Sequence, residues 1–202
     1  MAVNIKRQSI GKYQDLHIEI ITWDSVSAEV ELSCACLFHH EVGRDYFIGG
    51  LADLDHALGG QLRQIREDGY FNADLYQTLL LDQPQTTLKA PNALLIGMGN
   101  PEDLSVEKIG NTVSIAFKTA NQLGLESVAF APGILDTGIT PLPMLNQTML
   151  QALKTAWETH HYLHQKGLVK QATVKHWVFD VGEHNFEDKA QEYVDLFFKV
   201  FK

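Results

Sequence analysis

Cysteine is scarce in this sequence, which holds only Cys34 and Cys36 among its 202 residues. The two stand two residues apart in an apolar run, so both should point to one face of a strand, where they are poorly placed to bridge. A chain of this length can bury a core large enough to fold without disulfides. We therefore expect two buried structural thiols in a reducing compartment; a redox or metal-binding pair is the alternative.

Long apolar runs and basic clusters are missing as well. No stretch approaches the ~20 apolar residues of a membrane span, and the first residues, Met1 to Arg7, lack the apolar region of a signal peptide. The chain carries 16 basic and 25 acidic residues, a formal net charge of −9, without the concentrated Lys and Arg that nucleic-acid binding needs. These absences predict a cytoplasmic protein with neither a nucleic-acid nor a membrane partner.

Motifs that carry chemistry are equally absent. The sequence has no Gly-x-Ser-x-Gly elbow, no His-Glu-x-x-His helix and no Walker phosphate loop. It also has no paired cysteine set suited to zinc. We therefore assign no catalytic residue, no metal ligand and no cofactor from the sequence.

Apolar periodicity, by contrast, is strong along the whole chain and predicts alternating strands and helices. Strands are expected over residues 15–22, 28–38, 78–81, 93–98, 127–130 and 174–181, and helices over 51–67, 105–123, 143–166 and from 185 onward. Strand–helix–strand connections of this length imply parallel pairing with right-handed crossovers. We predict one α/β domain over residues 1–202: a three-layer α/β/α fold with a mixed, mostly parallel sheet and helices on both faces.

Two glycine turns precede predicted helices. Gly49-Gly50 is the better phosphate cradle, because free N–H groups at a helix start attract anions, although an ordinary turn explains it too. Gly97–Gly99 stands where a dinucleotide-binding fingerprint begins, but Glu102 replaces its third glycine and Pro101 removes a donor. We interpret that second turn as a tight strand-to-helix connection.

Three histidines, His160, His161 and His164, fall near the end of the helix predicted over 143–166. His160 and His164 are four residues apart and share a helix face, where they could chelate a metal. We favour a solvated cluster, because the helix dipole stabilises positive charge at a carboxyl terminus.

One run of motifs resembles a known family. It comprises the segments 49–62 (GGLADLDHALGGQL), 68–71 (DGYF), 77–81 (QTLLL), 93–99 (ALLIGMG) and 104–108 (LSVEK). In this order and spacing they resemble the N-terminal domain of the leucyl aminopeptidase family, over about residues 28–130. The resemblance implies a macro-domain-like fold. It also implies a domain without catalysis, because that family keeps its metal ions and catalytic Lys and Arg in a separate C-terminal domain, whose signature Asn-Thr-Asp-Ala-Glu-Gly-Arg-Leu is absent from the chain.

Two functions follow from the resemblance as expectations. The first is a non-catalytic assembly or interaction module, which associates with itself or with a protein partner. The alternative is a macro-type module that binds ADP-ribose or a nucleotide-like ligand, a small anion, with Gly49, Gly50, Gly133 and Gly138 as its binding loops.

Overall fold

The computed structural model describes residues 5–23, 26–43, 45–82, 84, 86–134, 139 and 142–202. Its strands and helices alternate along the chain as the apolar periodicity predicts. In chain order they are β1 (Arg7–Tyr13), β2 (Leu16–Ile21), β3 (Leu32–Leu37), α1 (Gly49–Ala57), α2 (Gln61–Glu67), β4 (Thr78–Asp82), β5 (Asn92–Gly97), η1 (Pro101–Asp103), α3 (Val106–Leu123), β6 (Ser127–Ala131), α4 (Leu145–Gln165), β7 (His176–Asp180) and α5 (Phe186–Val200).

The strands form one seven-stranded sheet in the order β1-β2-β7-β6-β3-β5-β4. The five strands from β2 to β5 in that order pair in parallel, and β1 and β4 pair antiparallel at the two edges. The predicted mixed, mostly parallel sheet is therefore confirmed. Strand β1 escaped prediction because its pattern is mostly exposed, as befits an edge strand, and its register shifts between Ser9 and Gly11.

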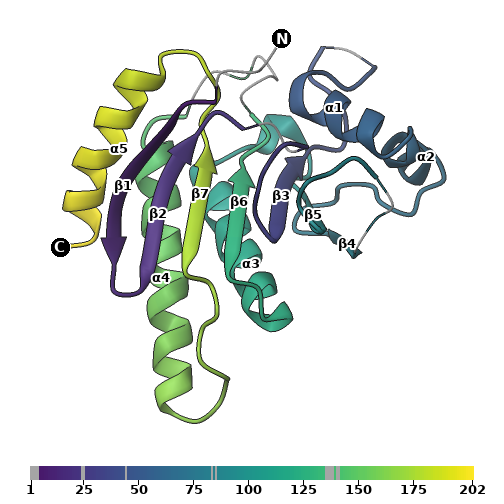
Figure 1. The fold of residues 1–202 in the computed structure, drawn as a ribbon. Coiled ribbons are helices and arrows are strands. Elements are labelled where there is room, and N and C mark those ends of the chain that lie inside the picture. The colour runs from purple at the N-terminus through teal and green to yellow at the C-terminus, as the bar shows by residue number, and fades with distance from the viewer. Residues whose placement is uncertain are drawn as a thin grey trace.

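Helices cover the two faces of the sheet unequally (Figure 1). On one face, α3, α4 and α5 pack over the main core, which holds Ile18, Cys34, Phe130 and Trp177. On the other face, α1 and α2 pack over Leu37 and its neighbours on the β3–β5 side of the sheet. No described helix lies over that face of β1, β2 and β7. The prediction of helices on both faces is thus right for only part of the sheet.

Local signals set both boundaries of α3. The Ser105 hydroxyl accepts a hydrogen bond from Lys108 N at 3.3 Å, and Gly124 ends α3 with φ +74°, both as expected. Gly59 and Gly60 divide the predicted 51–67 helix into α1 and α2. Nothing lies within 4 Å of a Cβ built on either glycine, and both have positive φ. Two glycines inside a predicted helix indicate either close packing or a bend. The structure confirms the bend and shows that the close-packing interpretation is wrong.

The structure tests two further expectations, one for the cysteines and one for Asn185. Cys34 and Cys36 are both buried and unbridged, and burial raises the pKa of Cys36 to about 12, as befits structural thiols. Asn185 stands at the N-cap of α5, but its side chain makes no capping hydrogen bond and its φ is +50°. The sequence predicts a side-chain cap at Asn185, because asparagine favours the N-cap position, and this prediction is wrong. None of the described helices is long and apolar enough to cross a membrane.

Candidate functional site

The carboxyl ends of the parallel strands meet at one edge of the sheet, where ligands of open α/β sheets bind. The chain leaves β3 toward α1 and α2 on one face, and leaves the neighbouring strand β6 toward α4 on the other face. Connections that diverge in this way open a crevice between neighbouring strands. Ile134, which follows β6, and Val181, which follows β7, line a cavity at this edge of the sheet.

A cavity of about 790 Å³ lies beyond the ends of β6 and β7. That volume falls within the range of about 300–1,000 Å³ typical of small-molecule sites. Its walls come from the loop that leads into α4, the loop that leads into α5, and the first turns of α5. The described lining residues are Ile134, Ile139, Leu142, Pro143, Met144, Leu145, Asn146, Val181, Gly182, Glu183, His184, Asn185, Lys189 and Glu192.

Two helix N-termini border this cavity. Met144 precedes α4 and Asn185 precedes α5, and both line the cavity. Both cap residues have left-handed backbones, and neither side chain makes a capping hydrogen bond. The first N–H groups of a helix have no partner within it, and the helix dipole makes them attractive to anions. The arrangement can therefore hold a phosphate or carboxylate group.

The charged side chains of the cavity are of both signs. Lys189 donates through Nζ to the carbonyl of Val181. Burial lowers the pKa of Lys189, and the charges of Asp180 and Glu192 only partly offset this effect. Glu192 accepts a hydrogen bond from Asn146 Nδ2 at 3.1 Å, which links α5 to α4 across the cavity wall. An anion bound here would rely on Lys189 and on the helix termini.

Of the described glycines predicted to bind a ligand, Gly133 stands directly before a lining residue of this cavity but does not itself line it. It follows β6 with φ +70°, and a Cβ built on it would lie 2.1 Å from the carbonyl oxygen of Cys36 in β3. The next residue, Ile134, lines the cavity. Gly49 and Gly50 begin α1 after β3 and are not among the lining residues. Gly138 lies outside the described residues.

The glycine turn after β5 serves packing. A Cβ on Gly97 would meet the carbonyl oxygen of Asp74 at 2.1 Å. The Asn100 side chain caps the short helix η1 through Glu102 N. These contacts agree with a tight strand-to-helix connection.

The histidines near the end of α4 contact the chain that follows the helix. His160 Nε2 lies 3.0 Å from Lys170 O, and His164 Nδ1 lies 3.1 Å from Val169 O. The ring of His161 stacks on Trp157 at a centroid distance of 5.0 Å. One ring nitrogen of His160 and one of His164 are thus engaged by backbone carbonyls of the following loop.

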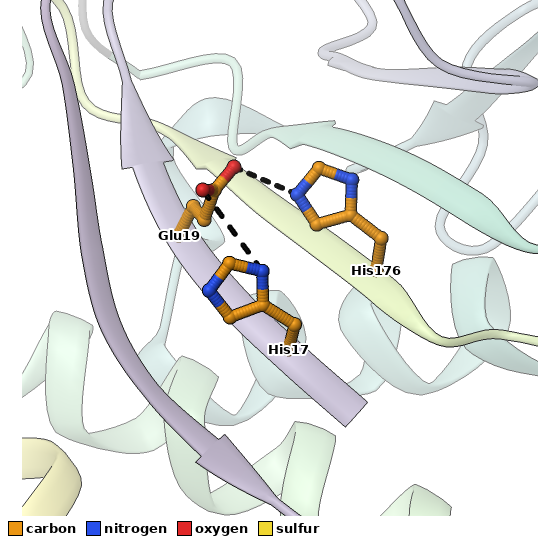
Figure 2. Close-up of side chains that lie close together, drawn as sticks. All are labelled: His17, Glu19 and His176. Carbon is orange, nitrogen blue, oxygen red and sulfur yellow. Dashed lines mark hydrogen bonds and ion pairs between the residues drawn. The ribbon is translucent and has the colours of Figure 1, made fainter. Parts of the chain in front are cut away.

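A second histidine cluster, which the sequence did not reveal, lies on the uncovered sheet face. Figure 2 shows the rings of His17 and His176 turned toward the carboxylate of Glu19. His176 Nε2 lies 2.7 Å from Glu19 Oε2, and His17 Nδ1 lies 3.9 Å from Glu19 Oε1. The alternation of β2 places His17 and Glu19 on one face. The parallel pairing that sets His176 opposite His17 is a tertiary fact with no local sequence signal.

Glu19 is the ionised centre of this cluster. Burial raises its pKa, but the hydrogen bond and charge of His176 and those of Arg7 outweigh burial, so the pKa is lowered overall. Arg7 Nε donates to Glu19 Oε2 at 2.9 Å. The carboxylate is thus held in its charged form among donors.

Residues 47–166 match the cytosol aminopeptidase family, N-terminal domain. No curated protein matches the chain. The structure resembles an Oceanobacillus iheyensis macrodomain with ADP, with a TM-score of 0.65 and 14% identity over 98% of this chain and 99% of that chain. A mutant of the same macrodomain with ADPR gives a TM-score of 0.62 and 13% identity over 96% of this chain and 100% of that one.

A mutant tomato leucine aminopeptidase is similar as well, with a TM-score of 0.65 and 16% identity. That match covers 94% of this chain but only 37% of the tomato chain. At identities this low the structural likeness shows the fold alone. It confirms the macro-domain-like α/β/α architecture expected from the sequence.

Proposed function

The chain belongs to the cytosol aminopeptidase family, since residues 47–166 match the N-terminal domain of that family, and on this premise we propose that it is a ligand-binding domain without peptidase chemistry. The match lies within the N-terminal domain of the family, to which the sequence assigns no catalytic residue. The ligand is a small molecule with phosphate groups, of the ADP-ribose class. The sequence favoured an assembly role over ligand binding. We now rank ligand binding first and assembly second.

The observation that carries the proposal is the cavity at the carboxyl edge of the sheet. Its volume of about 790 Å³ suits a nucleotide-sized molecule, and the starts of α4 and α5 offer sites for negative charge. Two of the similar structures, both of the Oceanobacillus iheyensis macrodomain, carry ADP and ADPR. The net charge of −9 opposes an anion at long range, so the affinity should rely on the local helix termini and Lys189.

ADP-ribose is therefore expected to stabilise the native chain in a thermal-shift titration. At 100 times its dissociation constant a ligand adds about 2.7 kcal/mol, which is roughly 5–10 °C for a chain of this size. Met144→Glu should abolish the shift, because it places a carboxylate at the start of α4. The same charge should leave the free protein as stable as before or slightly more so, because acids favour a helix N-terminus.

Met144→Gln is the matched control for this titration, because glutamine has nearly the same shape as glutamate but carries no charge. This variant should retain the thermal shift with ADP-ribose. Gly50→Glu tests the cradle predicted from the sequence and should also retain it. A flat response of the native chain contradicts the proposal. A response lost in Gly50→Glu but kept in Met144→Glu moves the site to the start of α1.

Assembly is the second candidate, and the tomato enzyme is the observation that favours it. There the similar region is only 37% of the chain, so a domain of this fold is part of a larger protein in that case. We propose that this chain likewise associates with itself or with a protein partner.

Sedimentation velocity of the full chain tests the assembly proposal. The expected result is a concentration-dependent species of at least twice the mass of one chain, with no hydrolysis of aminoacyl substrates by the same fractions. A monomer at all concentrations contradicts self-association. Turnover that co-sediments with the protein contradicts its non-catalytic character.

A further inference from the structure

Three strands bring polar and charged side chains together on the uncovered sheet face. His17 and Glu19 project from β2, His176 from β7, and Arg7 and Ser9 from β1. The cluster of His17, Glu19 and His176 offers one ligand atom from each residue, all within 4.8 Å of one another. No described helix covers it (Figure 1). None of these residues borders the cavity at the carboxyl edge.

The geometry points to a binding site for a divalent transition-metal ion, with His17 Nδ1, Glu19 and His176 Nε2 as its ligands; we propose zinc as the ion. Two imidazoles and one carboxylate form a ligand set that zinc accepts, with a fourth position left to water. Zinc binds these atoms at about 2.0–2.2 Å, which places tetrahedral ligand atoms about 3.3 Å apart. In the structure His176 Nε2 lies 2.7 Å from Glu19 Oε2 and His17 Nδ1 lies 3.9 Å from Glu19 Oε1, and one ligand atom of each residue lies within 4.8 Å of the others. Binding of an ion would draw these atoms together by rotation of the side chains.

The surroundings hold the ligands in place. Ser9 Oγ lies 2.8 Å from His17 Nε2, so His17 can donate from Nε2 to the serine and present Nδ1 to the ion. Outer partners of this kind fix the tautomer and orientation of metal-binding histidines. Glu19 Oε2 also accepts a hydrogen bond from Arg7 Nε at 2.9 Å. The side chains of His17 and His176 are 41% and 27% exposed, which leaves an entry path from solvent.

Removal of Arg7 distinguishes a metal site from a purely structural ion-pair network. The Arg7 guanidinium lies 2.9 Å from Glu19 Oε2, and a cation this close opposes a second cation on the same carboxylate. A purely structural ion-pair network would lose order when Arg7 is removed. A metal site would instead bind its ion more tightly.

The site is independent of the proposed ligand cavity. His176 is the first residue of β7, and Val181, which lines the cavity, follows the other end of that strand. Five residues of extended strand separate the two by about 16 Å. Zinc binding and ADP-ribose binding can therefore succeed or fail separately.

The test is a calorimetric titration of Zn²⁺ into the full chain after treatment with a chelator. We expect one equivalent to bind. Glu19→Gln and His176→Gln should each weaken binding more than about 100-fold, because the loss of an outer-sphere partner alone costs 10–100-fold. Arg7→Gln should bind more tightly than the native chain. Thermal unfolding without metal checks that each variant is folded.

The matched control is the triple variant His160→Gln, His161→Gln and His164→Gln, which removes the histidines near the end of α4. It should retain the native affinity and stoichiometry. Co²⁺ provides a second readout, since the visible absorption of a nitrogen-ligated ion should be present in the control and absent in His176→Gln. Absence of Zn²⁺ binding by the native chain overturns the proposal, as does binding that survives in His176→Gln and disappears in the control.

Discussion

Replacing Trp177 by alanine is expected to lower the free energy of unfolding by about 3–5 kcal/mol, the usual cost of deleting a large buried aromatic. Trp177 is fully buried in the middle of the sheet. Its ring lies 6.0 Å from Phe130 and 5.8 Å from Phe179, measured between centroids, and 6.2 Å from Phe117 of α3. The cavity left by alanine would separate the sheet from the helices behind it. Equilibrium unfolding in urea measures the effect.

Trp177→Phe is the control, and it should cost much less than its loss of volume suggests. The indole Nε1 of Trp177 is buried and has no hydrogen-bond partner among the described residues. An unsatisfied buried donor costs about 1–3 kcal/mol, and phenylalanine removes that penalty while keeping most of the ring. A loss in Trp177→Phe as large as that in Trp177→Ala would show that the indole is held by a hydrogen bond.

Gly133→Ala is expected to lower the free energy of unfolding by about 2–4 kcal/mol, a sum of two terms. One is the strain of a side chain at φ +70°, and the other is the overlap of its Cβ with the carbonyl oxygen of Cys36, 2.1 Å away. That atom belongs to the backbone of β3 in the centre of the sheet, so it cannot rotate aside. Urea unfolding gives the magnitude. The ADP-ribose response should weaken as well, because Gly133 directs the loop that lines the cavity.

Gly124→Ala separates the two terms. Gly124 has a similar φ of +74°, but nothing lies within 4 Å of a Cβ built on it. Its substitution should therefore cost only the backbone term, about 1–2 kcal/mol. Equal losses in the two variants would show that the loop after β6 can move away from β3.

The helices were predictable from the sequence because their signals are local. The buried face of α3, its serine cap and its terminal glycine all lie within one segment of chain, and the structure has them where the periodicity places them. Errors arose where tertiary contacts decide. Strand β1 is an edge strand paired with β2 across a register shift, and such a strand carries little apolar alternation. The Gly59-Gly60 pair predicted a bend in the helix. The open space around both glycines depends on tertiary packing and could not be predicted from the pair itself.

For the two candidate sites as well, some features depend on local sequence and others on tertiary contacts. The sequence by itself determined the fold class and the family, because these depend on periodicity and on motifs along the chain. Only the tertiary structure decided that the starts of α4 and α5 border one cavity, and that Gly49 and Gly50 stand apart from it. Only the parallel pairing of β2 with β7 brought His176 to Glu19 across 157 positions of sequence. Side chains from distant strands meet through sheet register, and register is set by the packing of the whole sheet rather than by any one of its segments.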